Sequence, residues 1–375
     1  MRASRPALCG GEYPKGNGSV PETAPPAMLR EAIYRISLGS PLPPGLLAGS
    51  LIELLGLESF AKEHLLASLM SGLMARGPAE SEVTELVRAA LVLDTVTPAT
   101  PLEHGVQGLV VLAGSGKKGL KTFNISTSSA IVAAAGGAYV IKIGSYATSS
   151  IMGSRDFASR MGLRQSRTSG AALSAVRRHG FAFVPVEETI PTLDSVYGGR
   201  FHVLTPFGFG LAGLASPVVG DKLIFGLSHP RVDLAASVLR QLGIRDAVVV
   251  GSQCRAGYFS DELGVGDASL LCELRDGEVG ETRILSADAM PGTEAVRSGA
   301  LSAPESQDEA LRWALEAVRG RGNPQHVHVV ALNAALVLHA AGLVSDLAEG
   351  YERAWGVIVD GQAAEKLAEL REERS

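Results

Sequence analysis

Residues 108–146 read GLVVLAGSGKKGLKTFNISTSSAIVAAAGGAYVIKIGSY, and they contain the main evidence for the fold of the chain. The apolar run Gly108 to Leu112 predicts a strand, the glycines after it predict a turn, and the alanine-rich stretch that follows predicts a helix. A second strand is predicted at Ala138 to Ile143. A glycine-rich turn that opens a helix presents free backbone N–H groups and the positive end of the helix dipole to one point, which suits a phosphate.

The side chains around this turn favour the same ligand. Asn124, Ser126 and Thr127 stand at the mouth of the predicted helix, where an amide and hydroxyls can cap the helix, bind phosphate oxygens or reach a magnesium ion. The glycine spacing also matches a dinucleotide fingerprint, but such a site needs an acidic residue at the end of the next strand. That strand ends in Lys142, whose ammonium suits a second phosphate better than a ribose.

Two further segments follow predicted strands. The loop Lys142 to Ser154 combines a lysine with small residues and many hydroxyls, which is typical of a loop that wraps a phosphorylated ligand. The pair Asp261-Glu262 follows the predicted strand Ala247 to Gly251 and can hold magnesium together with substrate phosphates. Since open sheets bind ligands at the carboxyl ends of their strands, we expect one shared site.

The rest of the chain predicts two domains of an α/β protein. Apolar residues recur with helical spacing from Ala27 to about Val96, and strands alternate with helices after Pro98, which favours a mostly parallel sheet. The interval Ser149 to Asp221 shows no clear strand. Helices are predicted over His326 to Ala341 and Leu347 to Arg371, and a short strand is one option for the residues just before the first of these helices. The expected organisation is a disordered leader over 1–27, a small all-helical domain over 28–98 joined by part of 150–215, and a larger α/β domain over 99–375.

Composition argues against several classes of protein. With 34 Lys and Arg against 39 Asp and Glu, the formal charge is −5, which argues against nucleic acid as the main partner. No apolar run is long enough for a membrane span, and Cys9, Cys254 and Cys272 lack metal-ligand spacing, so we expect structural thiols and a cytoplasmic protein.

Four other polar residues are not expected to take part in a site. In a strand, His326 and His328 would share one face, but they lack a third metal ligand nearby. Glu187 and Glu188 are expected to face solvent.

Together these segments resemble the anthranilate phosphoribosyltransferases, from a family of glycosyltransferases that also contains the pyrimidine nucleoside phosphorylases. The likeness spans about residues 28–372 and includes the late segment Asn333 to Leu336 with Gly342. It is strongest over Gly119 to Thr127, where the family's Gly-Leu-Lys-Thr-Phe-Asn-Ile-Ser-Thr stands unbroken.

The resemblance implies transfer of ribose 5-phosphate from phosphoribosyl pyrophosphate to an aromatic amine, with magnesium, by a homodimer paired through its helical domain. It places Ser126 and Glu262 on one magnesium ion and Asp261 with Glu262 on a second, while Arg200 meets the acceptor's carboxylate. The other positions facing the acceptor are Ile143, Ser145 and Tyr146. The residues expected to bind the donor are Gly114, Gly116, Lys117, Lys118, Thr122, Asn124, Ser126, Thr127, Lys142, Ser149, Ser150 and Ser154.

Two departures from the family pattern bear on the substrate. The family's Gly-Thr-Gly-Gly-Asp is here Gly114 to Lys118, so lysines stand near the pyrophosphate, and its Lys-His-Gly-Asn-Arg is here Lys142 to Tyr146. Loss of the histidine and asparagine predicts a small aromatic acceptor other than anthranilate, in specialised metabolism. The alternatives are a different donor or a site without activity, a phosphate-dependent nucleoside phosphorylase, and a non-catalytic homologue that binds a nucleotide or nucleic acid.

Overall fold

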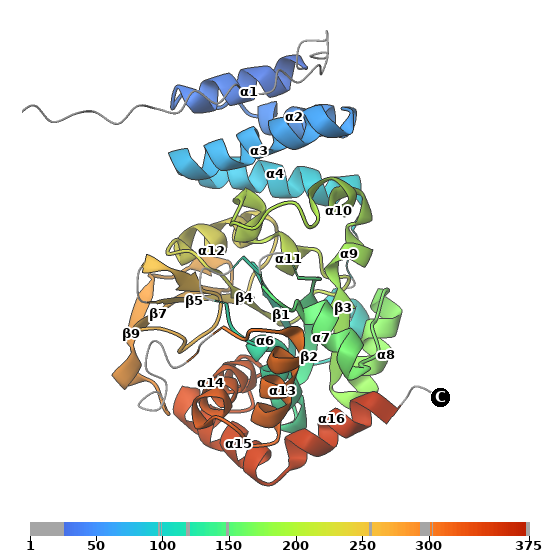
Figure 1. Ribbon diagram of the computed structural model, residues 1–375, viewed down its shortest axis with the longest axis vertical. Helices are drawn as coiled ribbons and strands as arrows, with labels where there is room; N and C mark the ends of the chain where they lie inside the picture. The colour runs from blue at the N-terminus through green and yellow to red at the C-terminus, as the bar shows by residue number, and fades with distance from the viewer. Residues whose placement is uncertain are drawn as a thin grey trace, which may run out of the picture.

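The computed structural model describes residues 26–96, 98, 100–117, 121–147, 150–254, 257–292, 301 and 303–372. Of the predicted leader, all but its last two residues lie outside this range. Four helices form a layer at one end of the molecule (Figure 1). They are α1 (Ala27–Ser37), α2 (Leu46–Leu55), α3 (Ser59–Arg76) and α4 (Glu80–Leu93).

The core of the larger part is a mixed sheet in the order β3-β2-β1-β4-β5-β7-β8. Its first five strands are parallel, as the strand and helix alternation predicts, and β7 runs antiparallel to β5. The short β6 pairs with β5, and β9 pairs with β7. The parallel strands are β3 (Phe181–Pro185), β2 (Tyr139–Gly144), β1 (Leu109–Gly114), β4 (Lys222–Gly226) and β5 (Ala247–Gln253). The remaining strands are β6 (Phe259–Ser260), β7 (Ala268–Arg275), β8 (Glu278–Val279) and β9 (Arg283–Ser286).

Helices cover both faces of this sheet, so its central strands are buried on both sides (Figure 1). In β1, Val111 packs in the core shared with α1 to α4 and with α12, while Val110 and Leu112 pack in the core shared with α6 and α14. The short helix α5 (Pro101–His104) precedes β1. The helices between the parallel strands are α6 (Ile125–Ala135), α7 (Ser154–Met161), α8 (Ser169–His179), α9 (Val186–Thr189), α10 (Pro191–Tyr197), α11 (Leu211–Leu214) and α12 (Val232–Gln241). The rest are α13 (Gln307–Val318), α14 (Pro324–Ala340), α15 (Leu347–Val359), α16 (Gln362–Glu372), and the 3-10 helices η1 (Pro206–Phe209) and η3 (Ala287–Ala289).

The segment after β2 returns toward the helical layer. Helices α10 and α11 and the 3-10 helix η1 all contact α4, and all three lie within residues 150–215. The assignment of this segment to the helical domain and the boundaries of the two domains stay predictions.

Three expectations for secondary structure are wrong. The interval Ser149 to Asp221 contains β3, whose five residues are all buried and so show no polar alternation to reveal a strand. The last segment forms two helices, α15 and α16, which separate at Gly361, where φ is +82°. The helix predicted over His326 to Ala341 is present as α14, but the short strand considered before it, on which His326 and His328 would have shared a face, is absent from the described chain.

Within the described ranges, no helix combines the length and apolar character that crossing a membrane requires. Cys254 and Cys272 are buried free thiols, in line with the structural role expected for them, and Cys9 lies outside the described residues.

Candidate active site

The three predicted turns meet in one hollow at the carboxyl ends of β1, β2 and β4, which we call the main hollow. Asp261 and Glu262 close it from the segment after β6. The predicted site residues that line it are Gly114, Gly116, Thr122, Asn124, Ser126, Lys142, Ile143, Ser145, Tyr146, Ser150, Ser154, Asp261 and Glu262.

The turn after β1 is fixed by its neighbours in the sheet. The backbone N–H of Ser115 donates to the carbonyl of Gly226 at the end of β4, at 2.8 Å. Gly116 has a φ of +66°, which favours glycine, and its N–H donates to Asp261 Oδ2 at 3.2 Å. The phosphate-type turn and the acidic pair are therefore in direct contact. Asn124 does not cap α6 through its side chain; its amide instead donates to the carbonyl of Met152 at 3.3 Å and ties this turn to the next loop.

The loop after β2 folds back against the start of α7. Asp156 Oδ2 accepts from the N–H groups of Gly153 and Ala147, at 2.9 and 2.8 Å. Gly144 is required at the end of β2, because a Cβ there would lie 2.5 Å from Ser154 Oγ and 2.7 Å from Phe183. These contacts bring Ser154 and the end of β2 to the same wall of the main hollow.

Lys142 is the basic side chain of the main hollow. It is buried, and its ammonium donates to the carbonyl of Ile143 at 2.5 Å. A buried ammonium facing a polar hollow at a sheet edge is suited to an anionic ligand.

The acidic pair is held by buried polar contacts. Glu262 is buried, and its Oε2 accepts from the hydroxyl of Ser260 at 2.7 Å. Asn333 on α14 accepts from the N–H of Leu263 at 3.0 Å and donates to its carbonyl at 2.9 Å, which fixes the turn just after the pair. A Cβ at Gly226 would lie 2.1 Å from the carbonyl oxygen of Asp261, so β4 must end in glycine for the pair to approach.

The donor set of the main hollow fits magnesium better than a transition metal. Two carboxylates and the hydroxyl of Ser126 supply oxygen ligands, the kind that magnesium takes alongside substrate phosphates. Among the described residues, no group of three or more His, Cys, Asp or Glu gathers into a metal cage. The remaining ligands of such an ion would come from water and the bound phosphates.

A second space, the side cavity, adjoins the main hollow and shares Gly114, Gly116, Ser145 and Tyr146 with it. Its volume is about 330 Å³, and α10 and η1 form much of its wall. Apolar and aromatic side chains dominate, including Phe207 and Tyr197, whose pKa burial raises to about 12.

Three charged side chains line the side cavity, namely Lys117, Asp194 and Glu187. The ammonium of Lys117 donates to the carbonyl of Phe201, and burial lowers its pKa to about 8. The carboxylate of Asp194 has no side-chain hydrogen bond or ion pair within the described part of the chain, and burial raises its pKa against the opposing positive charges of Arg155 and Arg200. The cavity thus offers an anionic acceptor of hydrogen bonds that no group of the described residues occupies.

Five predicted site residues are placed differently or not described. Lys117 lines the side cavity and not the main hollow. Thr127 lines neither, and its buried hydroxyl has no hydrogen bond among the described residues. Arg200 also lines neither; it donates to the carbonyl of Gly198 at 3.2 Å and lies 3.5 Å from Glu63. Lys118 and Ser149 lie outside the described residues.

The prediction that Glu187 and Glu188 face solvent is wrong. Both carboxylates bond to Arg155, and Glu187 lines the side cavity. Asp194 was also missed as a residue of the site. The unrecognised β3 explains both errors, because its carboxyl end delivers α9 and α10 to the same edge of the sheet as the predicted turns. The sequence feature that could have revealed β3 is the apolar run Phe181 to Val184.

Comparison with known proteins agrees with this geometry. Residues 107–364 match the glycosyl transferase family, a/b domain. An anthranilate phosphoribosyltransferase of Stenotrophomonas maltophilia (strain R551-3) is 32% identical over 304 residues, which cover 80% of this chain and 85% of that protein. The chain therefore belongs to this glycosyltransferase family as an anthranilate phosphoribosyltransferase-like member, and it is a pentosyltransferase.

Solved structures share the whole architecture. The anthranilate phosphoribosyltransferase of Thermus thermophilus has a TM-score of 0.70 at 25% identity, covering 91% of this chain and 98% of that one. The Saccharomyces cerevisiae enzyme in complex with PRPP and Mg has a TM-score of 0.71 at 20% identity, covering 91% and 96%. The small helical part and the larger α/β part with a mostly parallel sheet are thus confirmed as the fold.

Proposed function

We propose that this enzyme transfers ribose 5-phosphate from phosphoribosyl pyrophosphate to a small aromatic acceptor. One observation carries the proposal: the glycine turn after β1, the hydroxyl-rich loop after β2 with Lys142, and the pair Asp261-Glu262 line a single hollow. Support comes from the family of the chain and from the yeast relative, which binds PRPP and Mg.

In this reaction the bond between the anomeric carbon and pyrophosphate breaks, the acceptor's attacking atom bonds to that carbon, and the proton that this atom carried passes to water. Asp261, Glu262 and Ser126 would hold magnesium, which supplies charge neutralisation to the phosphates. Lys142 adds fixed positive charge, and the N–H groups of the turn after β1 orient the donor. The side cavity holds the acceptor beside the anomeric carbon, so positioning and electrostatics provide the rate enhancement.

The acceptor that the side cavity favours is an aromatic molecule other than anthranilate. Arg200 does not line the cavity, whereas Asp194 and Glu187 do, and these carboxylates repel an acceptor carboxylate placed beside them. The cation of the cavity, Lys117, donates to the carbonyl of Phe201. An acceptor with an N–H group besides its attacking atom would satisfy Asp194. We place this reaction in specialised metabolism, carried out by a homodimer that pairs through the helical part.

Release of pyrophosphate tests the function. The enzyme is incubated with phosphoribosyl pyrophosphate and magnesium across a panel of aromatic acids and of heteroaromatic amines. We expect release with an amine and little with anthranilate. Phosphate-dependent cleavage of nucleosides without pyrophosphate release would contradict the proposal and select a phosphorylase, and salt-sensitive oligonucleotide binding without either activity would select a non-catalytic homologue.

A further inference from the structure

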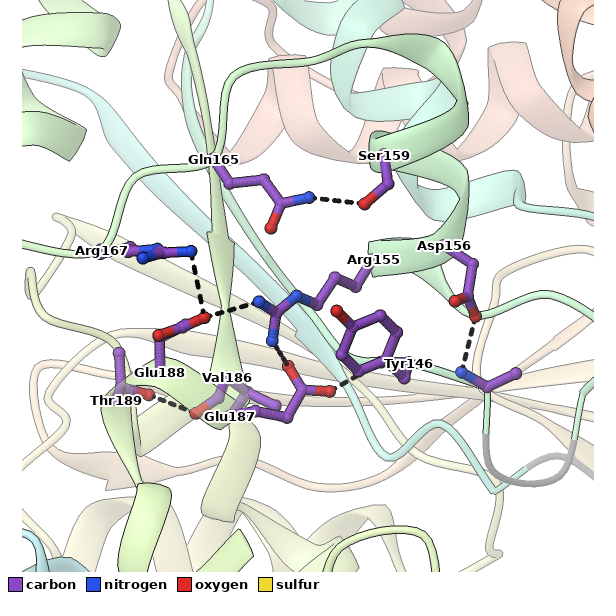
Figure 2. Close-up of polar contacts among 11 residues, drawn as sticks. Tyr146, Arg155, Asp156, Ser159, Gln165, Arg167, Val186, Glu187, Glu188 and Thr189 are labelled. Atoms are coloured by element: carbon purple, nitrogen blue, oxygen red, sulfur yellow. Dashed lines mark hydrogen bonds and ion pairs between the residues drawn. The ribbon is translucent and has the colours of Figure 1, made fainter.

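Arg155, near the start of α7, joins the two walls of the site (Figure 2). Its guanidinium donates to Glu187 at 3.1 Å and to Glu188 at 2.6 Å, both on α9. Its backbone N–H donates to the carbonyl of Ser145 at 2.9 Å. One residue therefore connects the loop after β2 with the helix after β3.

The same cluster fixes Tyr146 at two points. The guanidinium carbon of Arg155 lies 4.4 Å from the centre of the tyrosine ring, and Glu187 Oε1 accepts from the tyrosine backbone N–H at 2.7 Å. Because Tyr146 lines both the main hollow and the side cavity, this residue stands at the boundary between the spaces proposed for donor and acceptor.

Burial makes this cluster sensitive to a change in either partner. The side chains of Arg155 and Glu187 are only 9% and 12% exposed. Burial raises the pKa of Glu187, while Glu188 and Glu187 overcome the effect of burial on Arg155 and raise its pKa. A buried ion pair is weak evidence for a gain in stability. The pair of Arg155 and Glu187 lies beside the main hollow and the side cavity, so its placement favours a role in positioning Tyr146.

We propose that Arg155 and Glu187 are positioning residues that hold the Tyr146 ring between the two spaces, and that this ring sets which acceptor fits. The family pattern has an arginine where this chain has Tyr146, and Arg155 brings a guanidinium over that position from α7. The identity of the donor and the acceptor rests on the proposed function. The positioning of Tyr146 by Arg155 and Glu187 does not.

The test compares Arg155→Lys with Arg160→Lys. Lysine keeps the charge of Arg155 but cannot bridge two carboxylates with a planar fork. Arg160 lies on the same helix and pairs with the exposed Asp308, outside the cluster, so it is the matched control. Glu187→Gln is a second variant, which can still accept from the Tyr146 N–H but loses its charge.

Hydrogen exchange of residues 145–147 is measured first, without any ligand. We expect it to be faster by about tenfold in Arg155→Lys and unchanged in Arg160→Lys. With substrates present, Arg155→Lys should raise the acceptor KM by about tenfold and change the KM for phosphoribosyl pyrophosphate by less than about twofold.

Unchanged exchange in both Arg155→Lys and Glu187→Gln would overturn the proposal. So would an equal rise in both KM values accompanied by a lower melting temperature, because that pattern marks a purely structural role. If the wild-type enzyme releases no pyrophosphate with any acceptor, the proposed function fails, but the exchange experiment still decides whether Arg155 positions Tyr146.

Discussion

Lys117 introduces a titratable cation where the family pattern has a glycine. Burial lowers its pKa to about 8, so the folded enzyme loses this charge as the pH rises through that value. Lys117 follows Gly116, which lines both the side cavity and the main hollow, so its charge acts on the donor at short range. We expect kcat/KM for phosphoribosyl pyrophosphate to fall between pH 7 and 9, since this attraction of the anionic donor is lost. In Lys117→Arg the fall should disappear, because a guanidinium stays charged. A pH profile that is the same in both proteins would refute this role.

The carboxylate of Asp194 is the group in the side cavity that we expect to bind the acceptor. If its carboxylate accepts a hydrogen bond from the acceptor, Asp194→Ala should raise the acceptor KM by roughly 10- to 100-fold and leave the donor KM nearly unchanged. Ser195→Ala is the control, since Ser195 is an exposed neighbour on α10 whose hydroxyl donates to the carbonyl of Thr192. An unchanged acceptor KM in Asp194→Ala would mean that the acceptor makes no bond there.

At the scale of elements, α14 carries a buried histidine that makes stability depend on pH. His326 is 3% exposed, packs against Phe123 and Trp313, and has a pKa lowered to about 4 by burial. Between pH 6.5 and 4 the unfolded chain takes up a proton that the folded chain does not. The free energy of unfolding should therefore fall by up to about 3 kcal/mol over this range.

Urea unfolding at several pH values checks this effect. The fall should be much smaller in His326→Leu, whereas His339→Leu, at the other end of α14, should keep it. A fall of the same size in His326→Leu would assign the acid sensitivity to other groups.

The sequence predicts the elements well where periodicity or turn residues are strong. The strands over Gly108 to Leu112 and Ala138 to Ile143 are present within one or two residues as β1 and β2, because apolar runs there end at glycines. By contrast, β3 was missed, since a short strand buried on both faces has no alternation and lies between helices.

The same distinction applies to the site. Residues in the turns at strand ends were predicted to converge, and they line the main hollow. The side cavity was not predicted in detail, because its wall comes from α9 and α10, whose position depends on long-range packing against α4. The local sequence shows that Glu187 and Asp194 are carboxylates, but it does not show that they lie beside the predicted turns.

For the whole molecule, the central claim is that segments from distant parts of the chain bind phosphoribosyl pyrophosphate and its cation together. The most direct measurement is calorimetric titration of the enzyme with phosphoribosyl pyrophosphate and Mg²⁺, for the wild type, Lys142→Ala, and the double variant Asp261→Ala/Glu262→Ala, with circular dichroism to confirm folding. We predict magnesium-dependent binding by the wild type and a loss of about 100-fold or more in both folded variants. Unchanged affinity in both folded variants would contradict the account.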